Sequence, residues 1–293
     1  MTVSVIVTTY NRPYLCHEAV KSVLSQRQPP DEIVVVNDGE SFDLLGFERK
    51  NGIVLNFLQN ENSIGSNPSR HKGANASFGD ILMFLDDDDT WEPDKIKSQV
   101  NHFKNKKIGL VYSGKLIVSS NNRDKVLYKV PANFSGDASI KILKENFIGS
   151  TSSVAIRRNV YFESGGFDPE LPAIQDYDLW IRACQITEIK ADGGFNLRYT
   201  QHLSEGQISK DPKKKIESIK IIEKKYKRYF EKLNYLDNRK RRSKYFFNIS
   251  KIYKLNENKL YLKYLWKSIF LFPSPKYFSL FFPIDFIYKL TGR

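Results

Sequence analysis

Four consecutive aspartates, Asp86 to Asp89, are the residues of this sequence whose types and spacing most clearly indicate chemistry. They follow the apolar run Ile81–Leu85 directly. Like charges this close repel each other, and each costs free energy if it is buried without a partner. Divalent cations such as Mg²⁺ and Mn²⁺ are held by oxygen ligands, commonly one or two carboxylates together with substrate phosphates. We therefore expect a metal and phosphate site here, in preference to a solvated acidic turn before a helix.

The elements that must position these acids are predicted from the alternation of apolar runs and amphipathic stretches in the first hundred residues. Strands are expected at Val3–Thr8, Ile33–Val36, Val54–Leu58 and Ile81–Leu85, and helices at Tyr14–Gln26, Asn67–Ser77 and Asp94–Lys104. Strands that are apolar throughout and alternate with helices favour a mostly parallel sheet covered on both faces, an α/β fold. Ligands of such sheets bind at the carboxyl ends of the strands, where Thr8, Asp38 and Asp86 fall.

The second half of the chain has a less regular pattern. Strands are expected at Leu110–Val118, Ser152–Arg157 and Glu188–Asp192, with a hairpin tip at the polar Ser119–Asp124, a short helix at Ser139–Asn146 and a helix from Asp176 to about Gln185. The two cysteines, Cys16 and Cys184, are far apart and have no metal-ligand spacing. This indicates a reducing compartment and not a disulfide scaffold.

The net charge of +13 is concentrated near the C-terminus. Residues 203–293 carry 23 basic residues (Lys and Arg) and 8 acidic residues (Asp and Glu). Residues 1–202 carry 23 basic and 25 acidic residues. Helices are expected over residues 216–233, 245–255 and 259–272, followed by an aromatic stretch broken by prolines. Basic and aromatic side chains together suit an anionic membrane interface. The alternative is that these aromatics pack on the first domain or form an oligomer contact.

Several motifs together resemble the family 2 inverting glycosyltransferases of the GT-A fold. The resemblance covers about residues 1–205 and depends on the order of the motifs, which are Val3–Arg12, Glu32–Gly39, Gly65–Gly79, Phe84–Asp89 with Trp91–Asp94, Gly166–Asp168 and Gln175–Arg182. It implies a GT-A domain over residues 1–205 and a helical C-terminal region over residues 206–293. It also implies a nucleotide-sugar donor and a divalent metal, Mn²⁺ or Mg²⁺.

The resemblance assigns donor-binding roles to residues at the strand ends. Thr8 and Tyr10 match the start of the nucleotide pocket, with the Tyr10 ring available to stack on the base. Asp38 matches a carboxylate that accepts the uracil N–H, which favours a UDP-sugar. Arg70 is similar in position to a basic residue near the base and phosphates. Asp86 matches the ribose-binding acid.

The same resemblance assigns the metal and the proton transfer. Asp88 matches the acid that binds the metal, and Asp87 supports the donor side, while Asp89 is either part of the site or a cap of the turn before Trp91. His202 matches a histidine near the metal or diphosphate. Asp176 matches the general base that removes the proton of the acceptor hydroxyl. Asp178, two positions on, is the competing candidate for the base.

We therefore expect a metal-dependent inverting hexosyl- or N-acetylhexosaminyltransferase whose acceptor is a glycan or lipid-linked glycan of a bacterial surface-polysaccharide pathway. A nucleotidyltransferase that makes sugar nucleotides is the first alternative, although residues 8–13 hold no glycine for a phosphate loop. Nucleic-acid binding through the basic tail is the second, and it leaves the acidic strand ends unexplained. We expect neither a signal peptide nor a membrane-spanning helix. A cytoplasmic protein, peripheral on the inner face of the membrane, is the expected location.

Overall fold

The computed structural model describes residues 1–42, 52–202 and 211–281, which fold as two compact units. The first unit comprises Met1–Ala138, Phe147–Pro169 and Gln175–Gln201. The second comprises Ser139–Asn146, Glu170–Ile174 and the C-terminal part of the chain from His202. The domain boundary expected between residues 205 and 206 lies outside the described residues, so the division into residues 1–205 and 206–293 stays a prediction.

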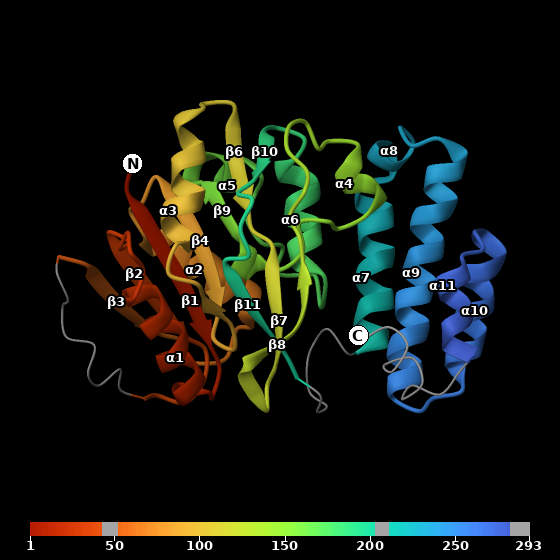
Figure 1. Ribbon diagram of the computed structural model, residues 1–293, viewed down its shortest axis with the longest axis horizontal. Coiled ribbons are helices and arrows are strands. Elements are labelled where there is room, and N and C mark those ends of the chain that lie inside the picture. Colours follow the sequence, from red (N-terminus) through yellow and green to blue (C-terminus); the bar gives the residue numbers. More distant parts are fainter. Residues whose placement is uncertain (43–51, 203–210, 282–293) are drawn as a thin grey trace. The chain divides into compact units, whose positions relative to one another are not determined.

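A seven-stranded sheet forms the centre of the first unit (Figure 1). Its strands, in order across the sheet, are β10 (Glu188–Ala191), β6 (Ile108–Tyr112), β9 (Val154–Arg157), β4 (Ile81–Asp86), β1 (Val3–Thr9), β2 (Glu32–Asn37) and β3 (Val54–Gln59). Only β9 runs antiparallel to its neighbours in this sheet. The predicted mostly parallel α/β fold is confirmed.

Helices cover both faces of this sheet, which is why its central strands are apolar throughout. The helices of the first unit are α1 (Pro13–Leu24), α2 (Ser66–Ala76), α3 (Lys95–Val100), α5 (Arg158–Glu163) and α6 (Gln175–Ala183). On one face, Val7 shares a core with Val20 of α1 and Ile96 of α3. On the other face, the ring of Phe84 lies 5.4 Å from that of Tyr161 in α5.

A four-stranded sheet lies beside the central one in the first unit. Its strands, in order, are β5 (Thr90–Trp91), β11 (Leu197–Gln201), β7 (Lys115–Ser119) and β8 (Asn122–Val130). The turn between β7 and β8 confirms the hairpin tip predicted at Ser119–Asp124. Strand β5 follows the acidic run and pairs with β11, so this sheet anchors the chain on the C-terminal side of the aspartates.

The single strand predicted at Leu110–Val118 is wrong, because the chain changes sheets at Ser113 and Gly114. The amide of Ser113 donates to the carbonyl of Ser153 (3.0 Å), and the amide of Gly114 donates to that of Gly194 (2.9 Å). A Cβ at position 114 would lie 2.9 Å from the Gly194 oxygen, a separation that real Cβ atoms do not show. A glycine is therefore needed where β6 ends and β7 begins.

The second unit is helical. Its helices are α4 (Lys141–Lys144), α7 (Pro212–Lys225), α8 (Lys227–Phe230), α9 (Tyr235–Leu255), α10 (Leu260–Leu271) and α11 (Pro275–Phe278). The helical character predicted for the C-terminal region is confirmed, but the one helix expected over residues 216–233 is two, α7 and α8, which are interrupted at Tyr226. Helix α9 begins at Tyr235 and not at Tyr245. Asp211 caps α7 through the amide of Lys213 (2.8 Å). Part of the aromatic stretch predicted after residue 270 lies outside the described residues.

Among residues 1–42, 52–202 and 211–281, no helix has both the length and the apolar character needed to cross a bilayer.

Candidate active site

The carboxyl ends of β1, β2 and β4 meet at one edge of the central sheet. The strand register pairs Thr8 with Asp86 on one side and with Val36 on the other. The amide of Asp38 then donates to the carbonyl of Thr9 (2.9 Å). The sheet therefore brings together the strand-end residues that the sequence predicted would converge.

The four aspartates alternate between partly exposed and buried side chains. Asp86 and Asp88 keep 28% and 17% of their side-chain surface exposed, whereas Asp87 keeps 1%. Asp89 is also buried. Asp86 is the last residue of β4, and Asp87 and Asp88 form a turn that the hydrogen bond from the Asp89 amide to the Asp86 carbonyl closes. The two partly exposed carboxylates are the ones available to a metal or a ligand.

Asp87 is held from two sides. The hydroxyl of Thr9 donates to its Oδ2 (2.8 Å), and Nη2 of Arg12 lies 2.6 Å from its Oδ1. Arg12 also reaches Asp88, with 3.3 Å between Nη1 and Oδ2. Burial raises the pKa of Asp87 to about 6, although the charge of Arg12 opposes the shift. Asp87 thus fixes Arg12 beside Asp88, and its predicted contact with the donor stays a prediction.

Asp89 joins the acidic turn to the second sheet. Its Oδ1 accepts the amide of Thr200 in β11 (2.9 Å), and its own amide donates to the carbonyl of Asp86 (3.0 Å). Complete burial raises the pKa of Asp89 well above its usual value, and the charges of Asp88 and Asp86 add to the shift. This bonding agrees with the structural role that the sequence left open for Asp89.

Arg70 of α2 pairs with Asp86 at 2.5 Å between Nη2 and Oδ1. Its guanidinium lies over the ring of Phe167, 5.4 Å from the centroid. Both Arg70 and Phe167 are buried, so the cation is fixed in place. The structure brings Arg70 to the acidic cluster, as expected of a residue near the donor phosphates, although its binding role is not tested.

Asp38 accepts four hydrogen bonds from the loop that precedes α2. Its Oδ1 accepts from the Asn60 amide group (2.7 Å) and the Ile64 N–H (2.8 Å). Its Oδ2 accepts from the Ser63 hydroxyl (2.9 Å) and the Gly65 N–H (2.8 Å). Burial alone would raise the pKa of Asp38, but these donors lower it. A uracil N–H would have to share an oxygen that already accepts two hydrogen bonds, and this predicted contact stays a prediction.

Asp176 stands in the first turn of α6, about ninety residues after the acidic run. Its Oδ1 accepts the amide of Tyr177 (2.7 Å). Burial lowers the pKa of the Lys115 amine, and the charges of Asp176 and Asp89 oppose this. Burial also raises the pKa of Tyr199, together with the charges of Asp89, Asp88, Asp86 and Asp176. The acidic turn and Asp176 therefore act on the same two side chains.

Asp178 has a different environment from Asp176. It is fully buried and pairs with Arg182, one helical turn further along α6. Arg182 also donates to the carbonyl of Gly166 (2.7 Å). Asp178 thus holds the segment before Phe167 in place, and this favours Asp176 as the candidate base.

The remaining predicted residues are Thr8, Tyr10 and His202. Thr8 is buried within β1, and Tyr10, immediately after β1, is 53% exposed and accessible to a base. His202 directly follows β11 and is partly buried. The second unit includes His202, and its role as a metal ligand stays a prediction.

The donor set fits a metal that is shared with a substrate. Among the described residues, no three His, Cys, Asp or Glu side chains are arranged to enclose a metal ion. Asp86 and Asp88 offer partly exposed carboxylates on a single turn. One or two carboxylates completed by phosphate oxygens is the usual arrangement for Mg²⁺ in nucleotide sites.

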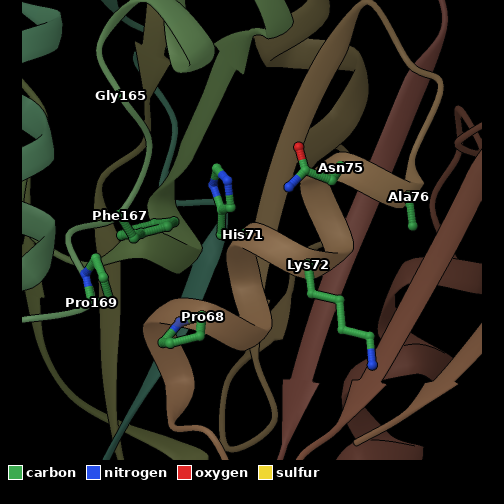
Figure 2. Close-up of a pocket in the computed structure, with 8 residues that line it drawn as sticks. All are labelled: Pro68, His71, Lys72, Asn75, Ala76, Gly165, Phe167 and Pro169. Carbon is green, nitrogen blue, oxygen red and sulfur yellow. The ribbon is translucent and has the colours of Figure 1, made fainter.

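A pocket of about 700 Å³ opens on the outer side of α2 in the first unit (Figure 2). Phe167, Pro169 and Gly165 form one wall, and His71 and Asn75 of α2 face it. The Lys72 side chain extends away from Phe167, and its amine donates to Asn60 (2.7 Å). None of the residues predicted for the donor, metal or base lines this pocket.

Three residues of the cluster were missed from the sequence. Arg12 stands within the first motif, and its charge next to the first strand could have indicated a partner for the acids. Lys115 and Tyr199 come from β7 and β11 of the second sheet, and their positions depend on pairing that no local pattern predicts. The amine of Lys115 lies 5.9 Å from the centroid of the Tyr199 ring.

Solved structures define the fold class of the chain as GT-A. One is S. aureus TarS 1-349 in complex with UDP-GlcNAc, with a TM-score of 0.56, 16% identity and coverage of 93% of this chain and 90% of that one. Another is the mannosyltransferase PcManGT from Pyrobaculum calidifontis in complex with GDP-Man and Mn2+, with a TM-score of 0.53 and 18% identity. That likeness covers 95% of this chain and 78% of the other.

Residues 4–165 match the family described as glycosyl transferase family 2, and the chain belongs to this family. An uncharacterized glycosyltransferase of Haemophilus influenzae is 29% identical over 185 residues, which are 62% of each chain. The match thus spans less than two thirds of that relative. Family membership favours sugar transfer over the two alternatives considered from the sequence.

Proposed function

We propose that this chain is a metal-dependent, inverting glycosyltransferase that moves a hexose or N-acetylhexosamine from a UDP-sugar to a hydroxyl of a glycan or lipid-linked glycan. The observation that carries the proposal is the placement of Asp86 and Asp88 as partly exposed carboxylates at the carboxyl end of β4, beside Arg70 and Arg12, together with Asp176 in the first turn of α6. Two of these carboxylates would face the donor, and the third would face the acceptor.

Asp176 acts as the general base in this proposal. Its carboxylate takes the proton of the acceptor hydroxyl while that oxygen attacks the anomeric carbon from the face opposite the diphosphate. The bond between the anomeric carbon and the diphosphate oxygen breaks in the same step, so the configuration inverts. Its place in the first turn of α6 supports the assignment, because Asp176 is partly exposed there whereas Asp178 of the same helix is buried and paired with Arg182.

Asp88 would hold the divalent metal and Asp86 would bind the donor ribose, and Arg12 and Arg70 add positive charge beside them. A bound Mn²⁺ or Mg²⁺ neutralises charge that develops on the departing nucleoside diphosphate. Ion pairs with the aspartates hold both arginines in place, and charges that are fixed in this way need little reorganisation during a reaction.

The solved neighbours support the choice of ligand. One was solved in complex with UDP-GlcNAc and the other with GDP-Man and Mn2+, so a nucleotide sugar is the shared class of ligand. We propose UDP because Asp38 stands at the end of β2, where the resemblance places the uracil contact. For a lipid-linked acceptor, the reaction would take place at the cytoplasmic face of a membrane.

The experiment is a binding panel on the full chain with UDP, GDP and dTDP, each with and without Mn²⁺. We expect binding of UDP that strengthens with Mn²⁺, and loss of this metal effect in Asp88→Ala. Asp124→Ala, an acid on the exposed β8 hairpin, is the matched control and should keep the wild-type response. Equal affinity for UDP with and without Mn²⁺ would contradict the proposed metal dependence. Tighter binding of GDP or dTDP than of UDP would contradict the proposed UDP-sugar donor.

A further inference from the structure

Helix α10 of the second unit has two unlike faces. Leu265 and Ser268 are fully buried on one side, where Leu265 shares a core with Phe247 of α9 and Tyr277 of α11. The Ser268 carbonyl accepts the hydroxyl of Ser243 in α9 (2.8 Å). This face fixes α10 to the rest of the unit, so the orientation of its opposite face is also fixed.

The opposite face presents large apolar side chains to solvent. Trp266 is 58% exposed and Phe270 is 84% exposed, and Leu262 completes a row with a spacing of four residues. Phe281 extends the row, because its ring lies 5.7 Å from that of Trp266. We name the four aromatic residues Trp266, Phe270, Phe278 and Phe281 the aromatic stripe. The sequence left open whether the aromatic side chains of this region pack internally. Within the described residues, the side chains of the aromatic stripe are exposed, whereas Phe247 and Tyr277 are buried.

A second row of lysines accompanies the aromatic stripe. Lys259, Lys263 and Lys267 are exposed and are also spaced by four residues. Residues 258–281 contain four lysines and no Asp or Glu. The exposed surface of α10 therefore joins bulky apolar groups to positive charge, with no carboxylate of the same helix to repel an anion.

We infer that the aromatic stripe and its lysines dock this chain on an anionic lipid bilayer. Trp and Phe side chains enter the boundary between headgroups and acyl chains, and lysine amines meet the phosphate groups at the same depth. A contact with a second copy of the chain would instead juxtapose two lysine rows of the same sign. The positive charge of the lysine row is complementary to an anionic lipid surface, and we therefore infer that such a surface binds this face of α10. This inference does not depend on sugar transfer and is tested separately from it.

The test uses the fluorescence of the full chain with vesicles of phosphatidylcholine alone and vesicles that also contain phosphatidylglycerol. Trp266 is the exposed tryptophan, since Trp91 and Trp180 are buried. We expect a blue shift with the anionic vesicles and co-sedimentation with them, and neither with phosphatidylcholine alone. Trp266→Phe should abolish the shift while it keeps the sedimentation.

Two sets of variants separate the contributions of the apolar side chains and of the lysines to vesicle affinity. Trp266→Ala with Phe270→Ala should lower vesicle affinity by about tenfold or more, because each ring buries apolar area on binding. Lys259→Gln, Lys263→Gln and Lys267→Gln should each lower it by roughly fivefold. Control variants remove equivalent groups elsewhere: Phe78→Ala, an exposed aromatic of the first unit, and a triple change of Lys213, Lys214 and Lys220 to Gln on α7.

Control variants that weaken binding as much as the stripe variants would overturn the inference, since the effect would then be one of total charge or hydrophobicity. Unchanged binding after removal of Trp266 and Phe270 would also overturn it. So would a change from dimer to monomer in these variants with no response to vesicles, because the stripe would then be a contact between copies. Circular dichroism of each variant checks that the helices remain folded.

Discussion

At the scale of single residues, the four aspartates of the acidic run have identical side chains but different partners. The apolar run before Asp86 indicated that the acids stand at a strand end, and the strand register confirms this. Only the family resemblance assigned different roles to the four, because four identical side chains carry no pattern of their own. The division arises from partners distant in the chain, with Thr9 and Arg12 at Asp87 and Thr200 at Asp89.

Lys95 is a second charged residue whose role only the structure reveals. Its side chain is fully buried at the start of α3, and the amine donates to the Ser153 carbonyl (2.6 Å) and the Ser113 hydroxyl (3.1 Å). It ties α3 to the junction of β6 and β9. Burial lowers the pKa of Lys95 from 10.5 to about 7, although the charge of Asp192 opposes the shift.

This lowered pKa predicts how stability depends on pH. Between pH 7 and 10.5 the unfolded chain keeps the Lys95 proton that the folded chain releases, so unfolding becomes less favourable as pH rises. This stabilisation by the neutral Lys95 amine is fully present above the pKa of Lys95 in the unfolded chain. It is lost as the pH falls towards the pKa of Lys95 in the folded chain. The free energy of unfolding rises through this effect by at most about 1.4 kcal/mol per pH unit.

Urea denaturation of the wild type and Lys95→Met across this pH range measures the slope. The difference in unfolding free energy, wild type minus variant, should increase with pH. Lys97→Met, on the exposed side of the same helix, is the control and should follow the wild type. A flat or falling difference for Lys95→Met would show that the lysine keeps an ordinary pKa in the folded chain.

At the scale of secondary structure, the strands with two buried faces were predicted best. Their continuous apolar runs are a strong signal, and β1, β2 and β4 lie where the pattern placed them. Strand β8 was missed because most of its side chains are exposed or half-buried, so its sequence has no apolar run. The junction at Gly114 was missed because the apolar pattern continues on both sides of one glycine.

Helix α2 provides a prediction at this scale, because it lies against the sheet through Gly73. A Cβ at this position would lie 2.5 Å from Cγ2 of Ile6 and 3.0 Å from Cγ2 of Val36. Alanine favours helices by about 1 kcal/mol over glycine, but overpacking a core costs about 1–3 kcal/mol. We therefore expect Gly73→Ala to lower the unfolding free energy and to displace Arg70 from Asp86.

Thermal or chemical denaturation of Gly73→Ala checks this cost, and UDP affinity reports the position of Arg70. Asn75→Ala is the matched control, since Asn75 is exposed on the same helix and gains propensity with no clash. It should be neutral or slightly stabilising. A stabilised Gly73→Ala would mean that α2 does not approach β1 and β2 as closely as the structure has it.

At the scale of the whole molecule, the charge distribution predicted a change of character near residue 203, but it could not predict the composition of the second unit. That unit also includes Ser139–Asn146 and Glu170–Ile174. The amide of Ala173 donates to the Ser218 hydroxyl (2.9 Å), and Lys144 pairs with Asp237 (2.8 Å). Such contacts join segments separated by many residues, and local periodicity carries no information about them.

The central claim is that the first unit transfers a sugar with Asp176 as the base and Asp88 at the metal. The most direct measurement compares wild type and Asp176→Asn for release of UDP from a UDP-sugar with Mn²⁺, together with the dissociation constant of the donor. We predict a rate about 10²–10⁴ times lower for Asp176→Asn, with donor affinity unchanged. A variant that binds the donor and releases UDP at the wild-type rate would contradict the account.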